Sequence, residues 1–122
     1  MDNQLLGQKG EEAAQVFLLK KGYRILERNF RLAQGELDIV AEKSGRIIFV
    51  EVKTIHQQDG FQGQDHVNQA KKRRLLKMAE LYLTRKGLGL ARAYQIDIVE
   101  VQMNTAGKLT VVNHLENALE DK

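Results

Sequence analysis

Apolar residues recur at two different spacings along this chain, and the change of spacing separates helices from strands. From Asp2 or Asn3, either of which can cap a helix, apolar positions return every three or four residues as far as Lys21. The pattern predicts a first helix that Gly22 ends. A second helical pattern, the strongest in the sequence, covers residues 67–86.

Most of the remaining chain has the character of strands. Residues 23–32, 36–42, 46–53, 94–101 and 108–113 alternate or are rich in β-branched side chains. A turn at Lys43-Ser44-Gly45 joins the second and third of these into a hairpin. Residues 54–66 have no periodicity, so we expect a polar loop there. The predicted order is αβββαββ, a mixed α/β fold in one domain that spans residues 1–122.

Length and composition limit the class of protein. With 122 residues, the chain can bury one core but not two independent ones. No apolar run approaches the roughly 18 to 20 residues of a membrane-spanning helix, and the first residues do not have the pattern of a signal peptide. There is no cysteine, which excludes disulfides, thiolate nucleophiles and cysteine-bound zinc. We therefore expect a cytoplasmic protein without a membrane partner.

The charges are unevenly distributed, although the net charge is only +3. Residues 71–92 hold eight Lys or Arg residues against one acid, Glu80, whereas acids gather in residues 36–51 and in the tail. This distribution suits a polyanion that is bound together with divalent cations. The candidate nucleic-acid contacts are Lys71, Lys72, Arg74 and Lys77. The alternative is a solvated helix face that keeps the protein soluble.

The hairpin predicts a cluster of charged side chains. If it turns about Ser44-Gly45, Asp38 faces Glu51. Glu36 then faces Lys53. Alternation places these four side chains on one face of the sheet, and places on the other face Leu37, Ile39, Val50 and Val52. Facing carboxylates destabilise a sheet unless a hard divalent cation such as Mg²⁺ or Mn²⁺ lies between them.

Asp38 and Glu51 therefore form a candidate metal seat. Lys53, two residues further along the same face, can reach an attacking water or a phosphate above that seat. It could orient the water, deprotonate it or stabilise charge on the phosphate, and the sequence leaves these roles open. The alternative is a solvated face with an ordinary cross-strand ion pair. Val40 and Phe49 continue the face as apolar neighbours and favour the metal site.

Glu11 is a further candidate. It lies on the helical stripe of Ala14 and Leu18, near the buried edge of the first helix, where a carboxylate needs a partner. It either joins the charged cluster or only complements the helix dipole. Gly7 and Gly10, which are poor helix formers, could let this turn approach another backbone or a phosphate closely.

Other titratable residues are weaker candidates. His56, Asp59 and His66 lie in the predicted loop, where such residues are usually solvated, so we expect no zinc there. Asp97 lies between two isoleucines, and alternation turns it away from them, toward a helix or solvent, in a structural or supporting role. His114 has no visible partner. No sequence signature of an organic cofactor is present.

Three segments resemble, in order and spacing, the bacterial YraN-type family of nuclease-like proteins. These segments are residues 35–40 (GELDIV), 49–53 (FVEVK) and 7–11 (GQKGE). That family is similar to the archaeal Holliday-junction resolvases and to the PD-(D/E)XK nucleases, whose fold is a mixed sheet flanked by helices. The resemblance therefore implies the restriction-endonuclease-like fold and a magnesium- or manganese-dependent endonuclease that hydrolyses nucleic acid, such as branched or single-stranded DNA.

The resemblance also implies roles for individual residues. Asp38 and Glu51 match metal ligands, the Val52 carbonyl matches a further ligand, Lys53 matches the catalytic lysine, Glu11 matches an acid of the first helix, and Lys71 matches a phosphate-binding position. A homodimer is a weaker implication. Two departures are visible: Leu37 stands where the name-giving motif has proline, and residues 54–56 (TIH) follow the lysine where relatives commonly have an arginine. The second departure removes a phosphate contact.

Two other functions stay open. The same fold and basic stripe could serve a catalytically inactive nucleic-acid-binding module or repair adaptor, because an intact motif does not prove turnover. An interaction protein that uses the exposed edge of its sheet is the third possibility.

Overall fold

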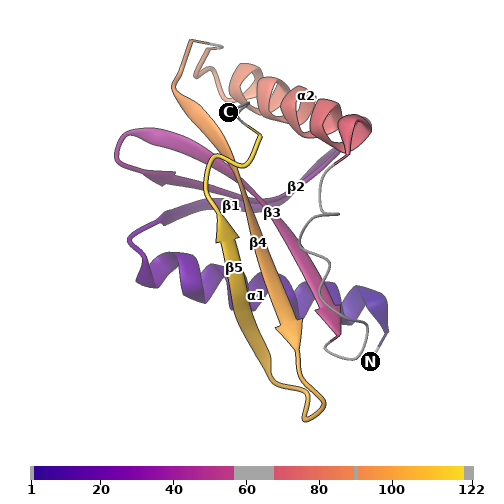
Figure 1. Ribbon diagram of the computed structural model, residues 1–122. Helices are drawn as coiled ribbons and strands as arrows, with labels where there is room; N and C mark the ends of the chain where they lie inside the picture. The colour runs from indigo at the N-terminus through magenta and orange to yellow at the C-terminus, as the bar shows by residue number, and fades with distance from the viewer. Residues whose placement is uncertain (1, 57–67, 90, 120–122) are drawn as a thin grey trace.

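The computed structural model describes residues 2–56, 68–89 and 91–119. Its elements in chain order are α1 (Asn3–Lys20), β1 (Arg24–Leu32), β2 (Gly35–Lys43), β3 (Arg46–His56), α2 (Gln69–Arg85), β4 (Tyr94–Met103) and β5 (Leu109–Leu115) (Figure 1). The predicted order αβββαββ is confirmed.

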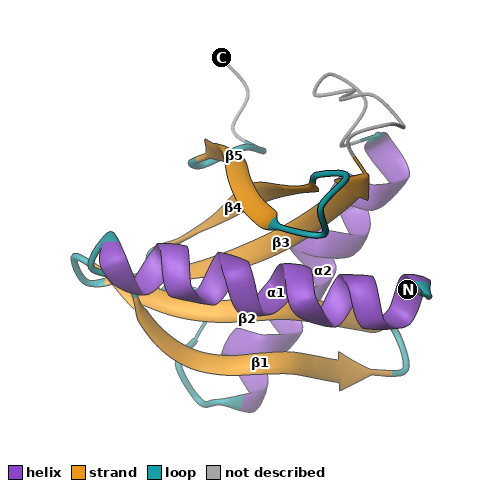
Figure 2. Cartoon of the chain, turned by 90° about the horizontal axis from the view of Figure 1, so that it is seen from below, coloured by secondary structure: helices purple, strands orange, loops and turns teal. Residues whose placement is uncertain are grey.

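The strands form one sheet in the order β1-β2-β3-β4-β5. Neighbouring strands are antiparallel except β3 and β4, which are parallel, with α2 between them in the chain. The two helices lie on opposite sides of the sheet (Figure 2). The predicted fold class, a mixed α/β sheet flanked by helices, is therefore confirmed.

The hairpin between β2 and β3 has the predicted register. Its paired residues have position numbers that sum to 89, from Lys43↔Arg46 to Ile39↔Val50. The two residues of the turn, Ser44 and Gly45, have φ angles of 54° and 78°. Positive φ at both central residues gives a turn whose twist matches that of the flanking strands.

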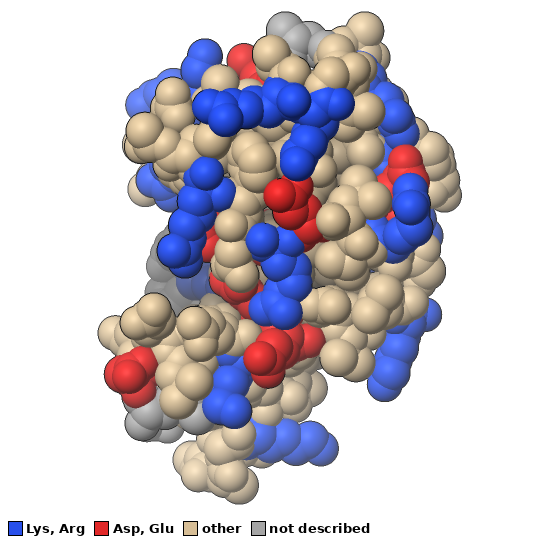
Figure 3. All heavy atoms as spheres, turned by 180° about the vertical axis from the view of Figure 1, so that it is seen from behind, with Lys and Arg blue, Asp and Glu red and all other residues tan. Residues whose placement is uncertain are grey.

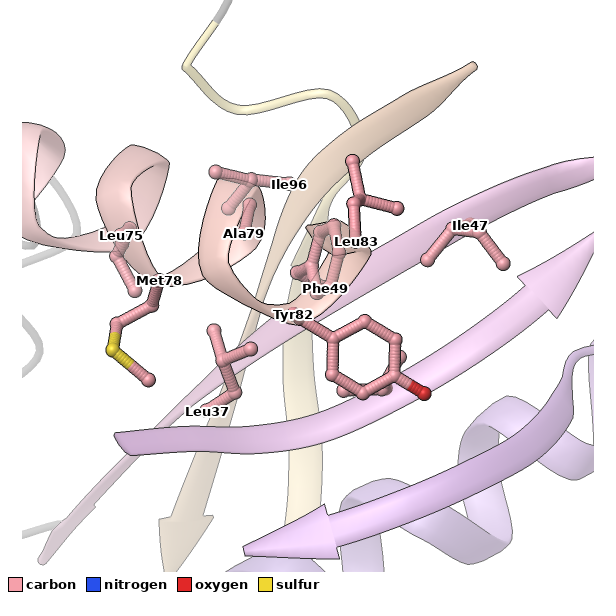
Figure 4. Packing of buried hydrophobic residues seen from close by; sticks show 10 residues of the cluster. Leu37, Ile47, Phe49, Leu75, Met78, Ala79, Tyr82, Leu83 and Ile96 are labelled. Atoms are coloured by element: carbon pink, nitrogen blue, oxygen red, sulfur yellow. The ribbon is translucent and has the colours of Figure 1, made fainter. Parts of the chain in front are cut away.

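Hydrophobic clusters fill the space on both sides of the sheet. The α2-side cluster consists of Leu37, Val40, Ile47, Phe49, Leu75, Met78, Ala79, Tyr82, Leu83 and Ile96 (Figure 4). The α1-side cluster consists of Ala14, Leu18, Tyr23, Ile39, Ala41, Ile48, Val50, Val99 and Val101. Successive residues of β3 alternate between the two clusters, because adjacent side chains of a strand point to opposite faces.

Side-chain caps fix the beginnings of both helices. Asp2 Oδ1 accepts a 2.7 Å hydrogen bond from the Leu5 N–H, as expected for the predicted cap of α1. Asn68 Oδ1 accepts a 2.8 Å hydrogen bond from the Lys71 N–H at the start of α2. The helix expected from residue 67 therefore begins at Gln69, and residue 67 itself lies outside the described residues.

β3 is longer than the sequence pattern predicted. It pairs with β4 as far as His56↔Met103, so residues 54–56 are strand, and their assignment to a loop was wrong. The neighbouring strand supplies ladder partners that a local pattern does not reveal. The rest of the predicted loop, with Asp59 and His66, lies outside the described residues.

None of the helices in the described ranges is long and apolar enough to cross a membrane. The cytoplasmic location stays a prediction.

Candidate metal centre

In both β1 and β2, the alternation of side chains between the two faces of the sheet is broken, at positions that lie opposite each other. In β2, Leu37 belongs to the α2-side cluster and Ile39 to the α1-side cluster, although residues two apart in a strand normally share a face. In β1, Asn29 lies between the paired residues Arg28↔Ile39 and Phe30↔Leu37, and its φ is 54°. The prediction that Leu37 and Ile39 share a face was therefore wrong, because a left-handed residue interrupts the regular pleat.

Asp38 lies at this irregularity. Together with Glu11 of α1, it lines a surface cavity of about 240 Å³. Its Oδ2 accepts a 2.8 Å hydrogen bond from the N–H of Val52. The described β2–β3 ladder ends one pair earlier, so the expected ladder pair of Asp38 with Glu51 is replaced by this contact one residue further along β3.

Three carboxylates meet in the cavity. Glu11, Glu36 and Asp38 each have one oxygen within 4.8 Å of the other two, and all three residues are half-buried. The structure thus brings Glu11 and Asp38 together, which is one of the two alternatives that the sequence left open for Glu11. Glu36, which alternation placed on the same face as Asp38 and opposite Lys53, also belongs to this group, although it was not singled out as a metal ligand.

Burial and the neighbouring negative charges disfavour the charged forms of Asp38 and Glu11. Burial raises the pKa of Asp38 to about 8, and the negative charges of Glu51, Glu11 and Glu36 add to the effect. Burial also raises the pKa of Glu11, with Glu36 adding to the shift and Arg28 opposing it. A group of hard oxygen donors that repel one another fits a divalent cation such as Mg²⁺ or Mn²⁺.

Glu51 lies on the side of β3 that faces α2. Its Oε1 is 3.6 Å from Nζ of Lys71 in the first turn of that helix. Among the neighbouring charges, Glu51 contributes most to the raised pKa of Asp38. Asp38 and Glu51 are therefore coupled electrostatically, although their other contacts are with different helices.

Lys53 and Val52 belong to the same end of β3. Lys53 is half-buried and pairs in register with Glu100 of β4. Glu100 is 1% exposed, and its Oε1 accepts a 3.0 Å hydrogen bond from Asn113 Nδ2. Val52 packs beside the α1-side cluster. The catalytic role of Lys53 and the ligand role of the Val52 carbonyl stay predictions.

The candidate nucleic-acid contacts lie along α2. Arg74 and Lys77 are exposed, whereas Lys71 and Lys72 are half-buried. The stem of Arg74 lies over Gly35, since a Cβ built on this glycine would stand 3.5 Å from Cγ and Cδ of the arginine. The basic helix thus passes the start of β2, next to the carboxylates. Figure 3 shows basic side chains around acidic ones on the face seen from behind.

Three residues of β1, not singled out from the sequence, contact the same carboxylates. Arg28 Nη2 is 3.7 Å from Glu11 Oε1, and Arg31 Nε is 3.2 Å from Glu36 Oε2. With its amide nitrogen turned toward both acids, Asn29 donates to Glu36 Oε1 at 2.8 Å and to Glu11 Oε1 at 2.9 Å. At these positions the sequence pattern indicated only a strand.

Gly10 allows α1 to approach β3 closely. A Cβ at Gly10 would stand 1.9 Å from Oγ1 of Thr54, a distance that no side chain tolerates. The expected close approach is therefore found at Gly10, with a side chain as the neighbour. Gly7 differs, because a Cβ built there has no neighbour within 4 Å.

A second polar cluster lies around Asp97. Asp97 has no exposed surface and accepts hydrogen bonds from Tyr23 Oη (3.0 Å), Gln95 Nε2 (2.8 Å), His114 Nε2 (2.8 Å) and the Asn117 N–H (3.0 Å). The placement away from the isoleucines was right, but exposure to solvent was not. His114, expected to lack a partner, also lies 2.8 Å from Lys21 Nζ. Apart from Gln95, these partners lie 17 or more residues from Asp97 in the sequence.

A protein-family model, that of "Uncharacterised protein family UPF0102", matches residues 10–101. The chain belongs to this family. The matched part of this UPF0102 protein includes Glu11, Asp38, Glu51 and Lys53 and the whole of α2. UPF0102 is a YraN-like family, so the membership inferred from the sequence is confirmed.

Individual UPF0102 proteins align over nearly the whole chain. The UPF0102 protein of Caldicellulosiruptor saccharolyticus is 39% identical over 118 residues, which cover 97% of this chain and 99% of the relative. That of Pelobacter propionicus is 40% identical over 121 residues, with 98% and 85% covered. A solved structure, that of Pyrococcus furiosus SfsA in complex with Ca²⁺, has a TM-score of 0.46 and 20% identity. The similarity covers 93% of this UPF0102 chain but only 64% of the SfsA chain.

Proposed function

We propose that this UPF0102 protein is a metal-dependent endonuclease that hydrolyses the phosphodiester bonds of nucleic acid, in the first instance branched or single-stranded DNA. The observation that carries the proposal is the position of Asp38. Its carboxyl group is held by the Val52 N–H within 4.8 Å of carboxylate oxygens from Glu11 and Glu36. Such a cluster is unfavourable without a cation, and folds generally keep such groups where function requires them.

The carboxylates of Asp38, Glu11 and Glu36, with Glu51 close by, would hold Mg²⁺ or Mn²⁺. The cation, when bound, would polarise a phosphoryl oxygen and lower the pKa of a water molecule. The Val52 N–H fixes the direction of the Asp38 carboxylate, so that the second carboxylate oxygen is available to the cation. We assign a further ligand role to the Val52 carbonyl on the resemblance alone.

Lys53 would act on the water or the phosphate. Its ammonium group extends from the same end of β3 as Glu51 and could orient the water or stabilise the negative charge that develops on the phosphate. Glu100 lies beside it in the neighbouring strand. A buried acid in this position would limit the mobility of the lysine side chain.

The start of α2 would bind the nucleic-acid backbone. Arg74 and Lys77 are exposed and Lys71 is next to Glu51, so the helix presents cations from the edge of the carboxylate cluster outward. Contacts of this kind position a nucleic acid without reading its sequence. We therefore propose a substrate that is chosen by its backbone shape.

One contact favours a second candidate function, that of an inactive nucleic-acid-binding module. Lys71 Nζ lies 3.6 Å from Glu51 and partly neutralises a residue that the endonuclease needs as a ligand. In addition, Thr54 packs against Gly10 in the segment where related nucleases commonly have an arginine. If both features persist when nucleic acid binds, the protein would bind without turnover.

Cleavage assays distinguish the two functions. Labelled linear, single-stranded and four-way-junction DNA, with matched RNA, are incubated with Mg²⁺ or Mn²⁺ and either the wild type or Lys53→Ala, purified identically. We expect cleavage by the wild type and a loss of at least about 100-fold in the variant. Equal cleavage by both proteins would indicate a contaminant and contradict the proposal. Binding without cleavage by either would support the binding module.

A further inference from the structure

Three polar residues of β1, Arg28, Asn29 and Arg31, contact the carboxylates, and Arg28 does so against the alternation of the strand. Phe30 and Leu32 pack beside the α2-side cluster. In a regular strand Arg28 would share their face. Because Asn29 adopts a φ of 54°, Arg28 turns instead toward Glu11 of α1.

The three polar residues of β1 then engage the two glutamates of the cluster. Arg28 lies against Glu11, Arg31 lies against Glu36, and the Asn29 amide bridges both carboxylates. Both Glu11 and Glu36 are therefore already paired with an arginine.

These contacts differ from ordinary surface ion pairs. The Arg28 side chain is 30% exposed, and its Nε is buried without a hydrogen-bond acceptor in the described part of the chain. A buried guanidinium donor of this kind is costly to leave without a partner. Asparagine adopts the left-handed conformation more readily than most residues, so the φ of Asn29 explains the direction of Arg28 and is not itself a sign of function. The buried Nε of Arg28 is the feature of β1 that favours a further acceptor, such as a phosphate oxygen.

Residues 54–56, which follow Lys53 at the end of β3, contain no arginine. Arginines that could contact a phosphate held at the carboxylate cluster must therefore come from other elements. The arginine fork of five N–H donors matches phosphate oxygens as well as it matches a carboxylate. Arg28 and Arg31 are the arginines that contact the cluster in the described part of the chain.

We propose that Arg28 and Arg31 form an exchangeable phosphate clamp. In the metal-free protein they neutralise Glu11 and Glu36, and when a divalent cation is bound by these carboxylates the guanidinium groups turn to the phosphates of the nucleic acid. Asn29 is the positioning residue that directs Arg28 to this side of the sheet. The inference deepens the proposed function and rests on it.

The change in the net charge of the site makes the exchange favourable. Fully ionised, the three carboxylates and two guanidinium groups carry one negative charge in sum, which repels a phosphate. A bound divalent cation changes the sum to one positive charge, and the arginines lose their tightest partners at the same time. Cation and nucleic acid should therefore strengthen each other's binding by the same factor, as linkage requires.

Binding measurements test this coupling without relying on turnover. All proteins carry Lys53→Ala, so that the DNA stays intact. Calorimetry gives the Mn²⁺ affinity without DNA, and fluorescence anisotropy gives the affinity for junction and single-stranded DNA with Mn²⁺ or with EDTA. The variant is Arg28→Gln with Arg31→Gln, and Arg31→Gln alone serves if the double variant does not fold, because the Arg31 side chain is 71% exposed. The matched control is Arg24→Gln, on the same strand but paired with Glu42 outside the cluster.

The proposal predicts that the variant gains Mn²⁺ affinity but loses the coupling between Mn²⁺ binding and DNA binding. Without DNA, the variant should bind Mn²⁺ about tenfold more tightly, because the competing guanidinium groups are gone. The tightening of DNA binding by Mn²⁺, expected to be about tenfold in the Lys53→Ala background, should fall below about twofold in the variant. Arg24→Gln should change neither quantity.

Each other outcome has a clear meaning. Weaker metal binding in the variant, or coupling equal to that of the control, would overturn the clamp while leaving the proposed endonuclease intact. Mn²⁺ binding by the background protein with no effect on DNA affinity would also overturn the clamp alone. Absence of Mn²⁺ binding altogether would overturn the proposed function and the clamp together.

Discussion

The backbone N–H of Val52 donates a 2.8 Å hydrogen bond to the Asp38 carboxylate. This contact joins β3 to β2 beyond the last pair of their described ladder. A carboxylate held by a backbone donor has a fixed direction, and one of its oxygens lies within 4.8 Å of oxygens of Glu11 and Glu36. The contact therefore orients the group on which the proposed metal centre depends.

Replacement of Asp38 by Asn should separate stability from metal binding. The amide keeps an acceptor for the Val52 N–H but removes a charge that burial and neighbouring acids disfavour. We expect the divalent-cation affinity to fall at least about tenfold, since a carboxylate ligand is lost. The free energy of unfolding in EDTA at pH 8 should stay equal or rise. Calorimetry and urea denaturation measure the two quantities, and a marked loss of stability would contradict this account.

Metal binding should depend on pH with a defined sign. The pKa of Asp38 is raised to about 8, so at pH 6 the carboxyl is mostly protonated and must lose its proton when a cation binds. We expect Mg²⁺ affinity to rise with pH toward 8 and then level off, with about one proton released per ion at low pH. Titrations in buffers of different ionisation enthalpy count the proton, and a pH-independent affinity between pH 6 and 8 would refute the assignment.

The carboxyl group of Asp38 also affects the stability of the metal-free protein. Because the folded-state pKa of Asp38 lies above its ordinary value, the proton stabilises the fold at low pH, and this contribution is lost as the pH rises through about 8. The wild type in EDTA should therefore lose stability between pH 6 and 9 relative to Asp38→Asn. If the stability of the two proteins changed in parallel with pH, the raised pKa of Asp38 would be contradicted.

The two glycines of α1 should respond oppositely to alanine. At Gly10 the new Cβ would stand 1.9 Å from Thr54 Oγ1, so α1 must shift, and we expect a loss of about 1–3 kcal/mol in the free energy of unfolding. At Gly7 nothing lies within 4 Å, so alanine should stabilise the helix by about 0.5–1 kcal/mol. Thermal and urea unfolding of the two variants test the pair, and Thr54→Ala combined with Gly10→Ala should recover part of the loss.

Asp97 should matter for stability and not for metal binding. Asp97→Ala would leave buried donors of Tyr23, His114 and the Asn117 N–H without an acceptor, and we expect a loss of about 3 kcal/mol. The exposed Glu116, which also accepts from Tyr23, serves as the control, because Glu116→Gln should change stability by less than about 0.5 kcal/mol. A changed Mg²⁺ affinity in Asp97→Ala, with its fold intact, would argue against a structural role.

The loss of stability at low pH should also depend on Asp97. Burial alone would raise the pKa of Asp97, but hydrogen bonds from His114, Asn117, Gln95 and Tyr23 outweigh it and hold this pKa below its ordinary value. The resulting stability is present above the ordinary pKa and is lost as the pH falls through the lowered one. Stability curves of the wild type and Asp97→Asn should therefore converge at low pH.

The basic stripe of α2 should determine how salt affects nucleic-acid binding. Neutralising Lys71, Arg74 and Lys77 together should weaken binding to all sequences and reduce the slope of log affinity against log salt by about three, one for each lost cation. Lys108→Gln, in the exposed turn between β4 and β5, is the control and should leave the slope unchanged. An unaltered slope in the triple variant would indicate that the basic stripe keeps the protein soluble and does not bind nucleic acid.

The local pattern of the sequence was sufficient for the elements and for part of the site. Helix α1 with its Asp2 cap, the turn at Ser44-Gly45 and the β2–β3 register follow from capping chemistry, backbone φ preferences and hydrophobic alternation. All of these act over a few residues. For the same reason the sequence could place Asp38 and Glu51 near each other, since one short hairpin connects them.

Tertiary structure decided which groups join them. The left-handed Asn29 breaks the alternation of two strands, and alternation from sequence assumes an unbroken pleat. Arg28 enters the site through that break, and Glu11 through the packing of Gly10 against Thr54. The sequence by itself determined the hairpin and its acids. Only the folded chain brings α1 and β1 to them, because those contacts depend on packing between elements far apart in the sequence.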